Sequence, residues 1–158
     1  MMRETVSRKL LLSLIPVLLL AGMSLTCKKE ELKLNTFFLL GSANGPEWLT
    51  VPAGDKRVYS FSVTDYMAIL PGHRPLWHLN FHVHDGDTLS WMLIRSEPYQ
   101  RWLVGEGYFT EADGHGCVLD TRAVNVPFVD TYYLVFLNHG PQEVELDGYS
   151  SVDWWEMQ

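Results

Sequence analysis

The stretch Leu76-Trp-His-Leu-Asn-Phe-His-Val-His84 decides the fold, because from its second residue onward it alternates between two chemical classes. The apolar positions are Trp77, Leu79, Phe81 and Val83. The polar positions are His78, Asn80, His82 and His84. Successive side chains of a strand point to opposite faces, so the alternation predicts a β-strand with one buried face and one hydrated face.

The rest of the chain after residue 35 also has the character of a β protein. No helical apolar period is sustained there, and short runs rich in Val, Leu, Tyr, Phe and Trp are separated by Gly, Pro, Asp and Asn. This pattern predicts an all-β antiparallel β-sandwich over residues 36–158. The predicted strands are Thr36–Leu40, Glu47–Val51, Arg57–Val63, Tyr66–Leu70, Leu76–His84, Thr88–Arg95, Arg101–Val104, Gly116–Asp120, Ala123–Val126, Thr131–Leu137 and Glu143–Trp154.

The loop Asp85–Asp87 joins the alternating strand to the next apolar run, Thr88–Arg95. A three-residue loop predicts a hairpin in which Phe81 lies opposite Trp91, so that apolar positions face one another. A loop one residue shorter would place His82 opposite an apolar side chain, because a slip of one residue in the pairing exchanges the two faces. The sequence therefore favours a direct pairing of these two strands.

Several short motifs along the chain carry a family resemblance. They are Leu49–Asp55, Tyr59–Val63, Leu89–Ile94, Tyr99–Trp102 with Gly105, Asp130–Asn138 and Val144–Leu146. In this order they resemble GOLD-type (emp24-like) domains, which are small jelly-roll sandwiches, from about Trp48 to Trp154. The chain departs from that pattern at Asp130, where the family has glycine, and in its histidine-rich strand. The resemblance implies a jelly-roll-like sandwich that makes non-catalytic contacts with protein, lipid or carbohydrate.

The first 26 residues have the plan of a secretory signal. Basic residues precede an apolar run, Leu10–Leu20, and small residues lead to Cys27. This order resembles a bacterial lipoprotein signal in which Cys27 is lipidated, although Ser24 and Thr26 depart from the usual lipobox. The alternatives are a plain signal peptide or an uncleaved anchor. On the lipoprotein interpretation, residues 1–26 are the signal peptide, residues 27–35 form a polar tether, and the domain lies on the cell envelope.

The charge of the chain argues against nucleic acid as a partner. It carries 12 basic and 19 acidic residues, a net charge of −7. The predicted signal peptide is itself basic, so the remainder is more acidic than the whole chain. Binding to phosphate backbones requires clustered Lys and Arg, which this composition does not favour.

The chain has two cysteines, Cys27 and Cys117. If the first is acylated, Cys117 has no intrachain partner, and we interpret it as a small buried residue. A Cys27–Cys117 disulfide is the alternative that replaces lipidation. His115 lies two residues away, but a nucleophile–base pair has no further motif to support it. The sequence therefore predicts no catalytic site and no enzyme.

Three histidines, His78, His82 and His84, share the polar face of the alternating strand. Residues two apart on a strand lie about 7 Å apart, so His82 and His84 are candidate ligands for one zinc or copper ion. His78 lies about 13 Å from His82 and joins them only if the sheet bends sharply. Further candidate ligands are Asp85, Asp87, His115 and His139. The alternative is a hydrated sheet face without metal.

Six tryptophans suggest sites of ligand contact. Trp77 and Trp91 belong to the predicted core. Trp154 and Trp155 are adjacent on the last strand and must point to opposite faces, so at least one is a candidate contact for a ligand such as a carbohydrate. The function predicted from the sequence is a membrane-anchored envelope lipoprotein that acts as a non-catalytic binding or structural module, with an envelope protein or carbohydrate as partner. The alternative is an envelope protein that binds Zn or Cu through His82 and His84.

Overall fold

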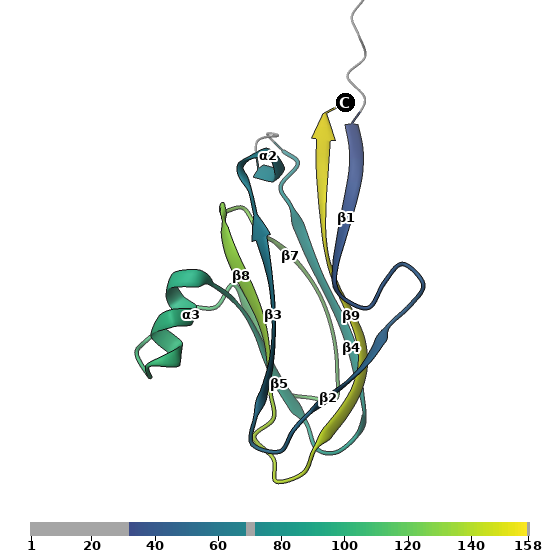
Figure 1. The fold of residues 1–158 in the computed structure, drawn as a ribbon, viewed down its shortest axis with the longest axis vertical. Coiled ribbons are helices and arrows are strands. Elements are labelled where there is room, and N and C mark those ends of the chain that lie inside the picture. Colours follow the sequence, from purple (N-terminus) through teal and green to yellow (C-terminus); the bar gives the residue numbers. More distant parts are fainter. Residues whose placement is uncertain (1–31, 69–71, 158) are drawn as a thin grey trace, which may run out of the picture. The chain divides into compact units, whose positions relative to one another are not determined.

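The computed structural model describes residues 32–68 and 72–157 (Figure 1). The predicted signal peptide, Cys27 and most of the predicted tether lie outside the described residues. No helix within the two described ranges has the length and apolar character needed to cross a membrane. The elements are β1 (Leu32–Leu40), β2 (Glu47–Val51), β3 (Lys56–Val63), α2 (Asp65–Ala68), β4 (Leu76–Asp85), β5 (Leu89–Arg95), α3 (Ser96–Leu103), β6 (Ala112–Cys117), β7 (Leu119–Asn125), β8 (Asp130–Leu137) and β9 (Val144–Met157).

The strands form two antiparallel sheets, which confirms the predicted all-β sandwich (Figure 1). The five-stranded sheet has the order β1-β9-β4-β7, with β2 paired to the first half of β9, and the four-stranded sheet has the order β3-β8-β5-β6. Because β1 and β2 both pair with β9, they act as one interrupted edge strand. With that strand counted once, each sheet has four strands in a jelly-roll arrangement.

The buried face of β4 is the one that its alternation predicts. Trp77, Leu79, Phe81 and Val83 are all buried in the main core between the sheets. Trp77 lies against Trp91 of β5 across the core, with ring centroids 5.8 Å apart. Its indole nitrogen donates a hydrogen bond to the hydroxyl of Ser150 on β9, at 2.9 Å. The two sheets are therefore joined by close packing, and the buried indole N–H has a partner.

The predicted hairpin between β4 and β5 is wrong. β4 pairs with β7 and β9, whereas β5 pairs with β6 and β8 in the other sheet. The Asp85–Asp87 region thus carries the chain from one sheet to the other. β5 is buried on both faces, because Met92 and Ile94 face a second cluster beneath α3 while alternate residues face the main core. A strand that is apolar on both faces does not specify its neighbour by alternation.

Two segments predicted as strands are helices. Residues 66–68 of the predicted strand Tyr66–Leu70 lie in α2, whose Met67 is buried in the main core, and its last two residues lie outside the described ones. The prediction over Arg101–Val104 falls on α3, where Pro98 occupies the first turn, a position at which a helix tolerates proline. Tyr99 of α3 stacks on Tyr133 of β8, with ring centroids 4.1 Å apart. Aromatic packing of this kind fixes a short helix that has little stability alone.

The sandwich begins earlier than predicted. β1 starts at Leu32, so residues 32–35 belong to a strand and not to a tether. They pair with the end of β9, from Leu32 opposite Met157 to Asn35 opposite Trp154. The predicted tether therefore extends no further than residue 31. Pairing with β9 explains the difference, because β9 continues to Met157 and provides hydrogen-bonding groups for a partner along its whole length.

Candidate functional site

The outer face of the five-stranded sheet carries the predicted histidines. His78, His82 and His84 all project away from the core, and their burial decreases toward the end of β4. Directly across the sheet, Asp147 of β9 lies opposite His82, and Trp48 of β2 lies opposite Asp147. Opposite residues on neighbouring strands have side chains about 5 Å apart, so three strands contribute to one small surface cluster.

His82, His84 and Asp147 form what we call the histidine cluster. One ligand atom from each lies within 4.8 Å of the other two. The Nε2 atom of His84 is 2.5 Å from a carboxylate oxygen of Asp147, and the two imidazole rings are 4.5 Å apart in a T-shaped arrangement. The ring of Trp48 lies over His84 at a centroid distance of 4.4 Å. The cluster is thus accessible on one side and bounded by an aromatic ring on another.

His78 stands apart from this cluster. Its Nε2 atom lies 3.1 Å from Asp153 of β9, without the alignment of a hydrogen bond. The other predicted ligands also have different neighbours: Asp85 accepts a hydrogen bond from the backbone of Gly86, and His115 pairs with Asp113 at 3.0 Å. The structure brings together two of the three predicted histidines, and adds a carboxylate that the sequence analysis did not propose.

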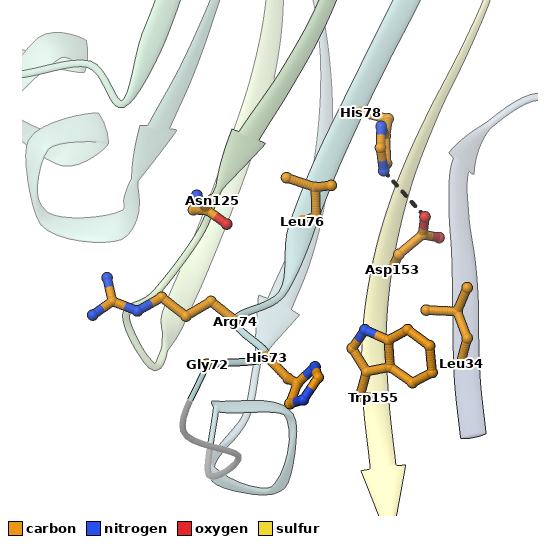
Figure 2. Close-up of a pocket in the computed structure, with 9 residues that line it drawn as sticks. All are labelled: Leu34, Gly72, His73, Arg74, Leu76, His78, Asn125, Asp153 and Trp155. Carbon is orange, nitrogen blue, oxygen red and sulfur yellow. Dashed lines mark ion pairs between the residues drawn. The ribbon is translucent and has the colours of Figure 1, made fainter. Parts of the chain in front are cut away.

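A groove lies beside His78 on the same face of the sheet (Figure 2). Its volume is about 580 Å³. Figure 2 shows His73 pointing toward Trp155, with Leu34 beside that indole ring and the His78–Asp153 pair near them. The residues that line it are Leu34, Gly72, His73, Arg74, Leu76, His78, Asn125, Asp153 and Trp155. The groove combines one large aromatic ring with both donors and acceptors of hydrogen bonds.

Trp154 and Trp155 face opposite sides of the sheet, as predicted. Trp155 lines the outer groove, whereas Trp154 packs against the core cluster. Trp154 also lines a second cavity of about 350 Å³ between the sheet edges, together with Phe37 and Phe61. Its indole nitrogen is buried without a hydrogen-bond partner among the described residues. Of the two rings, Trp155 is the one that faces the polar groove.

Cys117 is partly buried at the end of β6. Its sulfur lies 3.8 Å from a carboxylate oxygen of Asp120 and 3.7 Å from the backbone oxygen of His115. Burial raises the pKa of the Cys117 thiol, and the negative charge of Asp120 raises it further. The imidazole of His115 is paired with Asp113. This geometry stabilises the neutral thiol and gives no support to a Cys117–His115 nucleophile–base pair.

Comparisons with known proteins show only distant similarity. No family model matches the chain, and no curated protein matches it. Among solved structures, it is similar to a mitogen derived from Yersinia pseudotuberculosis, with 9% identity and a TM-score of 0.38 over 79% of this chain and 86% of that chain. It is also similar to PliG, a periplasmic inhibitor of g-type lysozyme from Aeromonas hydrophila, with 8% identity and a TM-score of 0.38 over 83% and 91%. At this level of similarity, nothing about the activity of this chain follows from either protein.

Sequence reasoning missed Asp147 and the groove residues His73 and Arg74. Asp147 is 65 positions from His82, and only the pairing of β4 with β9 brings them together. The sequence contained a partial signal, because three acidic residues of β9, at positions 145, 147 and 153, are separated by even numbers of residues and so share its polar face. Without the strand order, this signal cannot be connected to the histidines.

Proposed function

We propose that the chain is a membrane-anchored lipoprotein of the cell envelope, whose β-sandwich acts as a non-catalytic binding module of the GOLD-like type. The observation that carries the binding role is the groove at Trp155. Its volume of about 580 Å³ lies in the range typical of small-molecule sites. The non-catalytic part of the proposal agrees with the environment of Cys117, because burial and Asp120 raise the pKa of its thiol and disfavour the nucleophilic thiolate.

A saccharide is the ligand class that the groove supports best. Sugar rings present an apolar face that stacks on an indole, and their hydroxyl groups both donate and accept hydrogen bonds. Trp155 supplies the ring, Asp153 and Asn125 supply acceptors, and Arg74 supplies donors and positive charge. Arg74 also suits a carboxylate on the sugar. We therefore propose an acidic envelope glycan as the partner of this surface.

The anchoring part of the proposal is tested by growing cells with a clickable palmitate analogue. The full chain should incorporate the label and fractionate with membranes, whereas Cys27→Ser should lose both properties. Cys117→Ser is the matched control and should retain both. An unlabelled wild-type chain with an intact leader, or labelling that survives Cys27→Ser, would contradict lipidation at this residue.

The binding part is tested by sedimentation of the purified full chain with peptidoglycan in detergent. Trp155→Ala and Arg74→Ala should lower the bound fraction, because they remove the stacking ring and the cation of the groove. Trp48→Ala is the matched control, because Trp48 lies on the same sheet face, outside the groove, and is 64% exposed as a residue. Equal binding by wild type and Trp155→Ala would refute the groove as the contact surface.

A further inference from the structure

We propose that the histidine cluster is a surface site for a divalent late transition-metal ion, Cu²⁺ in preference to Zn²⁺. The ligands are His82, His84 and Asp147. This inference is independent of the saccharide proposal, because none of these three residues lines the groove at Trp155.

The strand register places Asp147 beside His82. The two residues are directly opposite one another in the β4–β9 ladder, so both side chains leave the same face of the sheet. Trp48 of β2 occupies the next position in the same row, opposite Asp147. Three neighbouring strands thus fix the backbone of the site, which limits the reorganisation needed to bind an ion.

A β-bulge brings His84 into reach. Side chains two residues apart on a regular strand lie about 7 Å apart, which is too far for shared hydrogen bonding. In β4 the register against β9 shifts between Val83 and Asp85, so that His84 is the extra residue. Bulges of this kind redirect a side chain. As a result, the ring centroids of His82 and His84 are only 4.5 Å apart, and Nε2 of His84 lies 2.5 Å from Oδ1 of Asp147.

The donor set determines the class of ion. Two imidazoles and one carboxylate suit copper and zinc, and Cu²⁺ binds most tightly among the first-row divalent ions. Ligand atoms that lie about 2.0 Å from a metal are about 3 Å from one another. The three ligand atoms already lie within 4.8 Å of each other, and the His84 side chain is 34% exposed. Small side-chain rotations are therefore enough to place an ion between them, with the ion replacing the direct His84–Asp147 contact.

Trp48 supplies a built-in reporter. Its ring lies 4.4 Å from the His84 ring, so Cu²⁺ held by that imidazole should quench the Trp48 fluorescence. The test titrates CuCl₂ into the full chain in detergent after removal of metal with a chelator. Calorimetry should show one equivalent bound, with a matching loss of fluorescence. Trp48→Phe should abolish the quenching while leaving the calorimetric affinity intact.

Variants of the ligands locate the site. Loss of a residue that only hydrogen-bonds to a metal ligand lowers metal affinity by about 10- to 100-fold, and loss of a ligand itself should cost at least as much. We therefore expect His82→Ala/His84→Ala to lower the Cu²⁺ affinity by about 100-fold or more, and Asp147→Asn by about 10-fold or more. His115→Ala is the matched control, because His115 is also an exposed histidine paired with an aspartate, on β6. It should bind Cu²⁺ like wild type. An unchanged circular dichroism spectrum shows that each variant is folded.

Several results would overturn the proposal. Wild type that binds no Cu²⁺ at equimolar loading has no such site. If Cu²⁺ binding persists in the folded double variant, the ion is bound by other residues. The same conclusion follows if His115→Ala lowers the Cu²⁺ affinity as much as the double variant does. Failure of the metal site leaves the groove proposal standing, because none of the three ligands lines the groove. For the same reason, Trp155→Ala should bind Cu²⁺ like wild type.

Discussion

Phe81 and His82 are neighbours on β4 that face opposite sides of the sheet, so they test the assignment of its faces most directly. Phe81 is 1% exposed and meets Phe136 edge-on, with ring centroids 5.6 Å apart. Its partner on β9 is Gly148, which has no side chain to fill a gap. We expect Phe81→Ala to lower the free energy of unfolding by about 4 kcal/mol, in the middle of the range for such truncations. His82→Ala should change it by about 0.5 kcal/mol or less, because that side chain is exposed.

The measurement is urea denaturation followed by tryptophan fluorescence, with a chelator present so that metal does not contribute. With a slope of about 2 kcal/mol per M, the loss at Phe81 corresponds to a midpoint lower by about 2 M, and the change at His82 to about 0.25 M or less. If Phe81→Ala is unfolded without urea, Phe81→Leu keeps the test open with an expected cost of about 1–2 kcal/mol. Equal costs at the two positions, or a larger cost at His82, would refute the assignment of the faces.

Two further predictions concern close packing and pH. In Gly148→Ala the new methyl group would lie 2.8 Å from a backbone oxygen of β4, so we expect a loss of about 1–3 kcal/mol in urea denaturation. Gly107→Ala has open space around it and should be near neutral; equal effects would contradict the packing at β4. Burial raises the pKa of Tyr132 to about 12. The folded state therefore keeps this proton at higher pH than the unfolded state, and stability should fall by up to about 1.4 kcal/mol per pH unit from about pH 10 toward pH 12. Urea midpoints across this range should show a shallower decline in Tyr132→Phe, and an unchanged slope would contradict the assignment.

The face pattern of β4 was predictable because it depends on local order alone. A period of two in side-chain polarity assigns each residue to one face, whatever strand lies beside it. The bounds of β8 were also predictable, since the predicted strand Thr131–Leu137 matches the observed strand Asp130–Leu137 except for one residue. The failures at α2 and α3 have a different origin. Both segments are too short for periodicity to distinguish helix from strand. Tertiary packing decides between the two, because Met67 of α2 is buried in the main core and Tyr99 of α3 stacks on Tyr133 of β8.

The candidate site was predictable only in part. The sequence identified His82 and His84 as neighbours on one face, and it predicted that Trp154 and Trp155 face opposite ways. It did not identify Asp147, and it placed β5 beside β4. Both outcomes depend on which strands become neighbours, and that choice is made by packing the apolar faces of all the strands at once.

The all-β class and the inward and outward faces of β4 follow from the amino-acid order alone, because both depend on the succession of side chains along the backbone. The partners of β4, the bulge at His84 and the approach of Asp147 emerge only in the folded sandwich. These depend on contacts between segments far apart in the chain, whose pairing is selected by the burial of apolar surface between two sheets.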